Sequence, residues 1–207
     1  MIPSKFLLSA LLFSTCMFLP TLGLADSTDY SNSGGTLSGS NAGLSLTGST
    51  LIAVVSQPGG SIVTGDLGTV TFTTGALSSG SLQMGGTLAG GGTFSIDGNG
   101  TNGIANGVLF SGTFSGPATW SLTTLSNGTH NYTLTGVLTG TAGFANMNGV
   151  TVQLTINTGK GFYNGSTVIS GGDTTVMSSI PEPSTLALFG TGALSLIGTI
   201  RRRVIRR

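Results

Sequence analysis

The sequence predicts an all-β protein, with a single Gly/Thr/Ser-rich antiparallel β-sandwich of ten to twelve strands. Between residues 43 and 173, segments of four to eight residues alternate apolar side chains with Thr or Ser, the period of a half-buried strand. Thr69–Thr73 and Val150–Ile156 are examples. The 36 glycines of the 207-residue chain disfavour long helices. Most connections are short enough for hairpins, which favours the sandwich.

A stacked β-solenoid is the alternative architecture. The sequence Gly-Thr-Phe-Ser at Gly92–Ser95 recurs at Gly112–Ser115, twenty residues later. A solenoid needs its period sustained over three or more repeats, and this is one clean recurrence. The sandwich is therefore the preferred prediction, and the solenoid stays open.

The N-terminal end, residues 1–25, has the pattern of a secretory signal peptide. Lys5 supplies the positive start, an apolar run follows, and small residues precede a cleavage site that we place between Ala25 and Asp26. Cys16 is the only cysteine and falls inside this discarded segment. The mature protein is therefore expected to contain no disulfide.

The rest of the exported part divides into three segments by its patterning. Residues 26–42 show little periodicity and are expected to be a flexible lead-in. A β-rich extracytoplasmic domain is expected over residues 43–173, and residues 174–180 read as a spacer.

The composition limits the classes of function. Charged residues make up 6% of the chain, far below the roughly 25% of a typical soluble domain. From Asp26 to Ser179 there are five Asp and one Lys, a net charge of −4 with the histidine neutral. Nucleic-acid binding needs clustered basic residues, so no nucleic-acid partner is expected. Disorder is also disfavoured, because 38% of the residues are apolar.

The C-terminal end, residues 181–207, has three parts in a fixed order. Pro181, Glu182 and Pro183 form an extended joint, because proline fixes φ and removes a backbone donor. Residues 184–200 are uncharged and reach roughly 25 Å as a helix, enough for a short transmembrane helix. The basic residues that follow stay on the cytoplasmic side, which places the rest of the protein outside. They are Arg201, Arg202, Arg203, Arg206 and Arg207.

This succession resembles the PEP-CTERM sorting signal of Gram-negative bacteria, a tail also found on some proteins labelled ice-binding. The resemblance implies that the tail holds the exported protein in the inner membrane until an exosortase cuts close to Pro181, Glu182 and Pro183. It also implies that the arginine cluster of residues 201–207 retains the protein in the membrane. Proteins of this family accompany exopolysaccharide and biofilm production.

The candidate catalytic and metal-ligating residues are few. His130 is the only histidine and is interpreted as a solvent-facing turn residue. Asp66, Asp97 and Asp173 each adjoin glycine and are interpreted as turn formers rather than as a glycosidase pair. Residues 97–103 place oxygen ligands at alternate positions but lack the Gly and Glu of an EF-hand loop, so a plain turn is favoured over a calcium site. No catalytic, cofactor-binding or metal-binding residue is predicted.

Three hypotheses for the function follow. The leading one is an exported, non-enzymatic bacterial cell-surface or extracellular-matrix protein. It is transiently anchored in the inner membrane, processed by an exosortase and associated with exopolysaccharide or biofilm. The second is a glycan-binding or ice-binding module that uses a Thr/Ser-rich sheet face, although Thr also suits the wet face of any strand. The third and weakest is a secreted hydrolase.

Overall fold

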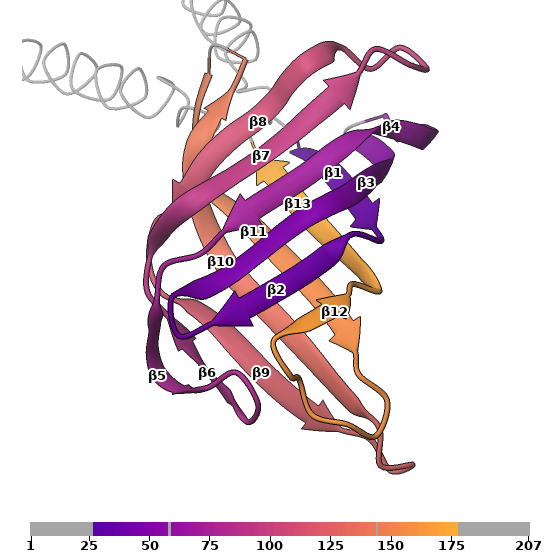
Figure 1. Cartoon of the computed structure of the whole chain (residues 1–207). Coiled ribbons are helices and arrows are strands. Elements are labelled where there is room, and N and C mark those ends of the chain that lie inside the picture. The colour runs from indigo at the N-terminus through magenta and orange to yellow at the C-terminus, as the bar shows by residue number, and fades with distance from the viewer. Residues whose placement is uncertain (1–26, 58, 144, 178–207) are drawn as a thin grey trace, which may run out of the picture. The chain divides into compact units, whose positions relative to one another are not determined.

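The structure is a computed structural model that describes residues 27–57, 59–143 and 145–177 (Figure 1). This part of the chain forms thirteen β-strands and no helix. In chain order the strands are β1 (Ser27–Ser33), β2 (Thr36–Ser40), β3 (Gly43–Gln57), β4 (Ser61–Thr73), β5 (Leu77–Ser81), β6 (Gly85–Leu88), β7 (Gly91–Asn99), β8 (Asn106–Phe114), β9 (Ala118–Thr124), β10 (His130–Ala142), β11 (Ala145–Asn157), β12 (Ser166–Val168) and β13 (Gly171–Met177). Within the same ranges, no helix has the length and apolar character that a membrane crossing needs.

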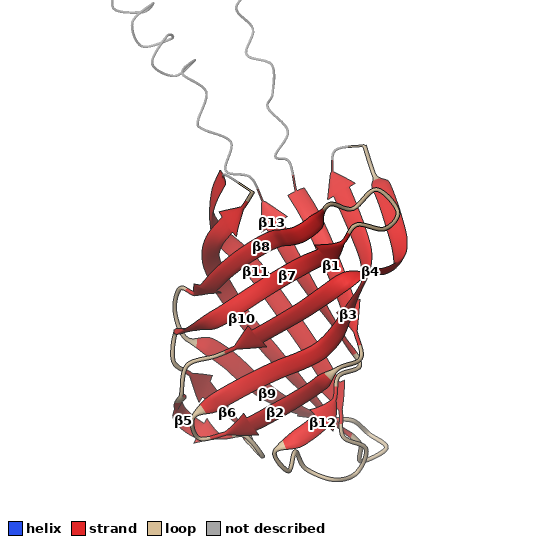
Figure 2. Cartoon of the chain, turned by 45° about the horizontal axis from the view of Figure 1, so that its top comes forward, coloured by secondary structure: helices blue, strands red, loops and turns tan. Residues whose placement is uncertain are grey.

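Eight of the strands close into a ring. The order around the ring is β11, β13, β1, β3, β4, β7, β8 and β10, and β10 pairs again with β11. All of these pairs are antiparallel. The result is a closed barrel, in which the strands of the near wall cross those of the far wall (Figure 2). Closure gives each ring strand hydrogen-bonding neighbours on both sides.

The remaining strands extend the wall at one end of the barrel. β10 divides one of its edges between two partners: β9 pairs with the half that begins at His130, and β8 pairs with Leu138–Thr141. β6 and β5 follow outward from β9. On the other side, β2 pairs with the beginning of β3 and carries β12.

The all-β prediction is confirmed, but the described strands form one closed barrel rather than the predicted sandwich. Sandwich and barrel share alternating strands and short hairpins, and they differ here in the pairing of β10 with both β8 and β11. The solenoid alternative also fails. The repeated Gly92–Ser95 and Gly112–Ser115 segments lie on the neighbouring antiparallel strands β7 and β8, with Phe94 opposite Gly112, so they are not stacked repeats.

The expected flexible lead-in over residues 26–42 is wrong where the structure describes it, because β1 and β2 belong to the sheet. In β1 the residues that face inward are Thr28, Tyr30 and Asn32. Tyr30 is the only apolar residue among the seven of this strand, so the sequence shows no alternation there. Asn32 is buried, and its Nδ2 donates to Ser49 Oγ at 2.7 Å. A polar core pair therefore replaces the apolar residue that the sequence pattern requires.

The expected spacer over residues 174–180 is also partly strand. β13 runs to Met177 and lies between β11 and β1. Its last residue is opposite Ser27, the first residue of β1. The folded domain thus extends beyond the predicted residues 43–173 at both ends, and its two chain ends are neighbours.

A single apolar core fills the barrel. Four phenylalanines from β4, β7 and β8 form its centre, with Phe72 and Phe94 stacked at 5.8 Å between ring centroids. Phe110 and Phe114 meet Phe94 edge-on at 6.1 Å and 6.4 Å. The interior is therefore packed with side chains, as expected for a barrel of about eight strands.

A second aromatic cluster closes the end of the barrel where β9, β6 and β5 extend the wall. Trp120 stacks on Tyr132 at 5.2 Å, and Tyr163 meets Trp120 edge-on at 5.7 Å. Trp120 Nε1 donates to the Leu82 carbonyl at 2.9 Å, and the Tyr132 hydroxyl donates to the Gln83 carbonyl at 2.6 Å. These bonds hold the β5–β6 turn against the barrel.

Candidate functional site

The residues predicted for sorting and for cleavage lie outside the described residues. They are Pro181, Glu182, Pro183, Arg201, Arg202, Arg203, Arg206 and Arg207 at the C-terminal end, and Ala25 and Asp26 at the N-terminal end. The predicted signal peptide and the predicted transmembrane helix also lie outside the described residues.

His130 is a buried strand residue, so the prediction of a solvent-facing turn residue is wrong. Its side chain is 9% exposed at the start of β10. The imidazole stacks on Phe162 with ring centroids 4.4 Å apart, and Nδ1 is hydrogen-bonded to Thr124 Oγ1 at 3.0 Å. The Thr124 hydroxyl could in principle serve as a nucleophile. Among the described residues, however, no carboxylate is hydrogen-bonded to the imidazole to orient it as a base. The contacts are those of a packing residue.

The carboxylates expected in turns lie in strands, and those predictions are also wrong. Asp66 is in β4, Asp97 in β7 and Asp173 in β13, and each of the three accepts a hydrogen bond from a different side chain. Ser95 Oγ donates to Asp97 Oδ2 at 2.6 Å. Across the described ranges, no three His, Cys, Asp or Glu residues gather where they could hold a metal ion.

The glycine-rich segment of residues 97–103 uses its polar side chains to bind the protein itself. Asn99 Oδ1 accepts hydrogen bonds from the Thr101 amide at 3.1 Å and the Thr101 hydroxyl at 2.6 Å. Asn102 Nδ2 donates to the Thr64 carbonyl at 3.1 Å. The segment is thus fastened to β4 by the side chain of Asn102.

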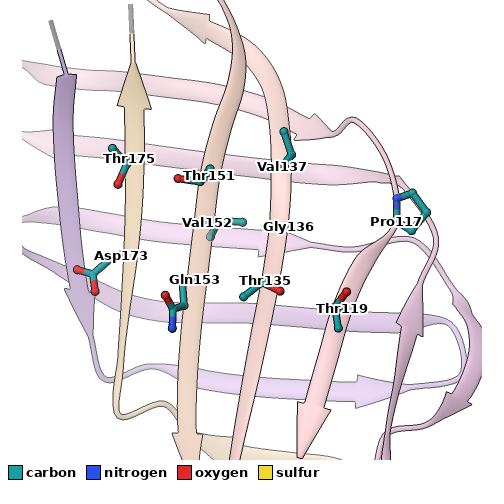
Figure 3. Close-up of a pocket in the computed structure, with 10 residues that line it drawn as sticks. All are labelled: Pro117, Thr119, Thr135, Gly136, Val137, Thr151, Val152, Gln153, Asp173 and Thr175. Carbon is teal, nitrogen blue, oxygen red and sulfur yellow. The ribbon is translucent and has the colours of Figure 1, made fainter. Parts of the chain in front are cut away.

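The outer surface of β9, β10, β11, β13 and β1 carries a continuous line of polar side chains. Cross-strand register places its members opposite one another on these five adjacent strands. We call them the polar row: Thr119, Thr135, Gln153, Asp173 and Ser31. Figure 3 shows the first four of these side chains in line across their strands. At about 4.8 Å between strands, the row extends ~19 Å.

A second row lies two residues away from the polar row on β10, β11 and β13 (Figure 3). Val137 is opposite Thr151, and Thr151 is opposite Thr175. Pro117 extends this row beside Val137, whose side chain is 44% exposed. We call these four residues the flanking row. It is apolar at the β9–β10 side and hydroxylated at the β11–β13 side.

Two adjoining hollows follow the polar row. The first, about 480 Å³, is lined by the polar row from Thr119 to Asp173 and by the flanking row. The second, about 430 Å³, shares Gln153 and Asp173 with the first and continues to Ser31 and Gly171. The hollows are shallow and solvent-facing, so together they form a groove that crosses the strands.

The polar groups of the groove differ in what they already bind. Ser31 Oγ donates to Asp173 Oδ1 at 2.6 Å. By contrast, the side chains of Thr119, Thr135 and Gln153 make no hydrogen bond to another described residue. Their donors and acceptors are therefore available to a ligand.

Sequence reasoning identified the hydroxyl-rich strand faces but not this groove. The alternation along β10 and β11 already indicates that Thr135 and Gln153 face outward. The neighbours of these residues depend on pairing between segments as distant as β1 and β13, which alternation does not encode.

Comparison with known proteins identifies the tail. The matching family model is described as the PEP-CTERM protein-sorting motif, and it covers residues 179–207. This motif implies that the chain is exported, associates with the membrane and is sorted by an exosortase. The chain therefore carries a PEP-CTERM sorting motif at its C-terminal end, as the order of its C-terminal segments predicted. No curated protein and no solved structure matches the chain.

Proposed function

We propose that this chain is a non-enzymatic component of the bacterial cell surface or extracellular matrix and that it acts in contact with exopolysaccharide. The sorting motif at residues 179–207 is the observation that carries the proposal, because it implies export and sorting by an exosortase. The barrel supports it. Residues 27–177 contain four Asp and one Lys, a net charge of −3, and their outer strand positions are rich in hydroxyls. Such a surface is suited to a hydrated polysaccharide.

A passive or binding role is favoured over hydrolysis by the arrangement of the ionisable groups. His130 is buried against Phe162, and Asp66 and Asp97 are engaged by neighbouring side chains. A hydrolase needs a nucleophile with a positioned base, or two carboxylates that flank the scissile bond. The third hypothesis, a secreted hydrolase, therefore has the least support. Turnover of polysaccharide by the purified barrel would establish it.

The second hypothesis, a binding module, is supported by the groove. Between its two forms, glycan binding is favoured over ice binding, because ice recognition needs a flat and regular hydroxyl lattice. The strands of a closed barrel twist and tilt, so the outer face curves. Its hydroxyls are also interrupted by Gln153, Asp173 and Val137.

Processing of the tail is tested with the full-length chain in a host with and without exosortase. With the enzyme present, mass spectrometry of the mature protein is expected to show a C-terminus close to Pro181–Pro183 and a start at Asp26. Without the enzyme, the arginine-bearing tail is expected to stay on the chain in the inner-membrane fraction. Glu182→Ala should slow the processing, whereas Thr113→Val in the barrel should not change it. An identical tail in both hosts would contradict the sorting step.

A further inference from the structure

We propose that the polar row is the binding track for one strand of a neutral polysaccharide, which crosses β9, β10, β11, β13 and β1 along the groove. This inference rests on the matrix role proposed above and names the ligand class and the site. The track comprises Thr119, Thr135, Gln153, Asp173 and Ser31, with the flanking row beside it.

The hydrogen-bonding groups of the track match a polyhydroxylated ligand. A sugar hydroxyl both donates and accepts, and so does the hydroxyl of Thr119 or Thr135. The Gln153 amide adds two donors and an acceptor, and the ionised Asp173 adds acceptors only. Ser31 occupies one oxygen of Asp173 and holds the carboxylate in place, which leaves the other oxygen available for the ligand.

The apolar side of the groove suits the carbon face of a sugar ring. Pro117 and Val137 line the first hollow next to Thr119 and Thr135. Val137 is 44% exposed. Covering its methyl groups with a sugar ring removes apolar surface from water, which favours binding. A pyranose ring with an apolar face and equatorial hydroxyls can contact both rows at once.

The charges around the groove select a neutral chain. Asp173 lines both hollows. Asp29 lies two residues away along the same β1–β13 pair, opposite Thr175. Thr175 Oγ1 donates to Asp29 Oδ1 at 2.9 Å. The lining residues of the two hollows include no Lys, Arg or His. A polyanionic chain is therefore repelled by two carboxylates with no cation to offset them.

The dimensions fit a segment of chain rather than a single sugar. The two hollows share Gln153 and Asp173, so a ligand passes from one to the other without leaving the row. The second hollow is open because Gly171 has no side chain there. A Cβ at Gly171 would meet only the Asn32 carbonyl oxygen, at 3.7 Å, and the φ of Gly171 is outside the left-handed region. A larger residue at this position would block the track without straining the backbone.

The test uses residues 26–179, which contain the complete barrel and its core. Binding is measured by isothermal calorimetry and by affinity electrophoresis with a soluble β-glucan, dextran and the polyanion alginate. Thr135→Val with Gln153→Ala removes central polar groups, and Gly171→Leu fills the second hollow. The matched controls are Thr113→Val on β8 and Gly116→Leu, where the added side chain meets open space.

The wild-type barrel is expected to bind at least one neutral glucan and not alginate. Each track variant should weaken that binding at least about tenfold, while each control stays within about twofold of the wild type. Absence of binding to both neutral glucans overturns the proposal, as do track variants that bind like the wild type or stronger binding to alginate. Inhibition of ice recrystallisation that the same variants abolish would assign the row to ice instead. None of these outcomes depends on the exosortase experiment, which tests sorting separately.

Discussion

Ser31 and Asp173 fasten the first strand of the barrel to the last. Ser31 Oγ donates to Asp173 Oδ1 at 2.6 Å across 142 residues of sequence. Two residues further along the same strand pair, Thr175 Oγ1 donates to Asp29 Oδ1 at 2.9 Å, with the roles of the two strands exchanged. Each strand thus contributes one hydroxyl and one carboxylate. These two side-chain hydrogen bonds link β1 and β13 in addition to the backbone hydrogen bonds between the strands.

The Ser31–Asp173 bond should show as a coupling energy in a double-mutant cycle. Ser31→Ala, Asp173→Ala and the double variant are compared by urea unfolding at neutral pH. We expect a coupling of about 1 kcal/mol, because a hydrogen bond to a carboxylate at the surface is partly offset by lost hydration. A cycle of Ser31 with Asp97, on β7, should give no coupling. A Ser31–Asp173 value as small as that control would mean that the bond does not stabilise the barrel.

Tyr132→Phe should destabilise the barrel more than Tyr163→Phe. The Tyr132 hydroxyl donates to the Gln83 carbonyl and accepts from the Tyr163 amide at 3.1 Å, so its loss leaves two backbone groups without this partner. The Tyr163 hydroxyl makes one bond, to the Leu37 carbonyl at 3.2 Å. We expect losses of about 2–3 kcal/mol for Tyr132→Phe and about 1 kcal/mol for Tyr163→Phe in denaturant unfolding. The reverse order would show that the β5–β6 turn is not held by Tyr132.

The stability of the barrel should fall in strong alkali in a way that depends on Tyr163. Burial raises the pKa of Tyr163 from 10.0 to about 12. The unfolded chain therefore releases this proton near pH 10, while the folded chain keeps it until about pH 12. Between these values the unfolded state binds fewer protons, so the free energy of unfolding decreases as pH rises.

The alkaline effect is measured by urea unfolding at a series of pH values from 8 to 12. Below about pH 10 the contribution of Tyr163 should be constant, and Tyr163→Phe should flatten part of the decline above it. Burial also raises the pKa of Tyr30, so some decline should remain in the variant. Identical pH profiles for the wild type and the variant would exclude Tyr163 as a cause.

Gly140→Ala should strongly destabilise the seam at which the barrel closes. Gly140 lies opposite Gly112 in the short β8–β10 pairing, and a Cβ on Gly140 would collide with the Ser111 carbonyl and the Gly112 backbone. We expect a loss of about 2–3 kcal/mol, the scale of overpacking in a tight core. Gly116→Ala is the control, because its Cβ meets nothing within 4 Å, and it should be neutral or slightly stabilising. Equal effects would contradict the close approach at the seam.

The local patterns predicted the strands better than their arrangement. Alternation in segments such as Thr69–Thr73 reports which residues face inward, and the structure agrees for Val70 and Phe72. The same pattern misses β1, where Asn32 and Ser49 form a buried polar pair. Closure was not predictable because it depends on the contact of β8 with β10, four residues on each side.

The types of residue in the candidate site were predictable from the sequence, but their positions in the fold were not. The turn signal Asn127-Gly128 predicts that His130 lies in a turn, yet His130 is the first residue of β10 and stacks on Phe162 from a distant loop. Thr135 and Gln153 were recognisable as outward residues. Their alignment with Asp173 and Ser31 requires β13 to insert between β11 and β1, and no short-range signal specifies that insertion.

The pairing of Ser27 with Met177 has a consequence for the timing of folding. β13, which completes the ring, is the last of the barrel strands to be synthesised. The barrel therefore cannot close until nearly the whole domain has been made. A polypeptide that crosses a membrane through a translocation pore benefits from this delay, because the barrel has not yet closed while the chain is being exported. The cost is slow maturation, because joining the two extremities of the domain requires contacts of very large sequence separation.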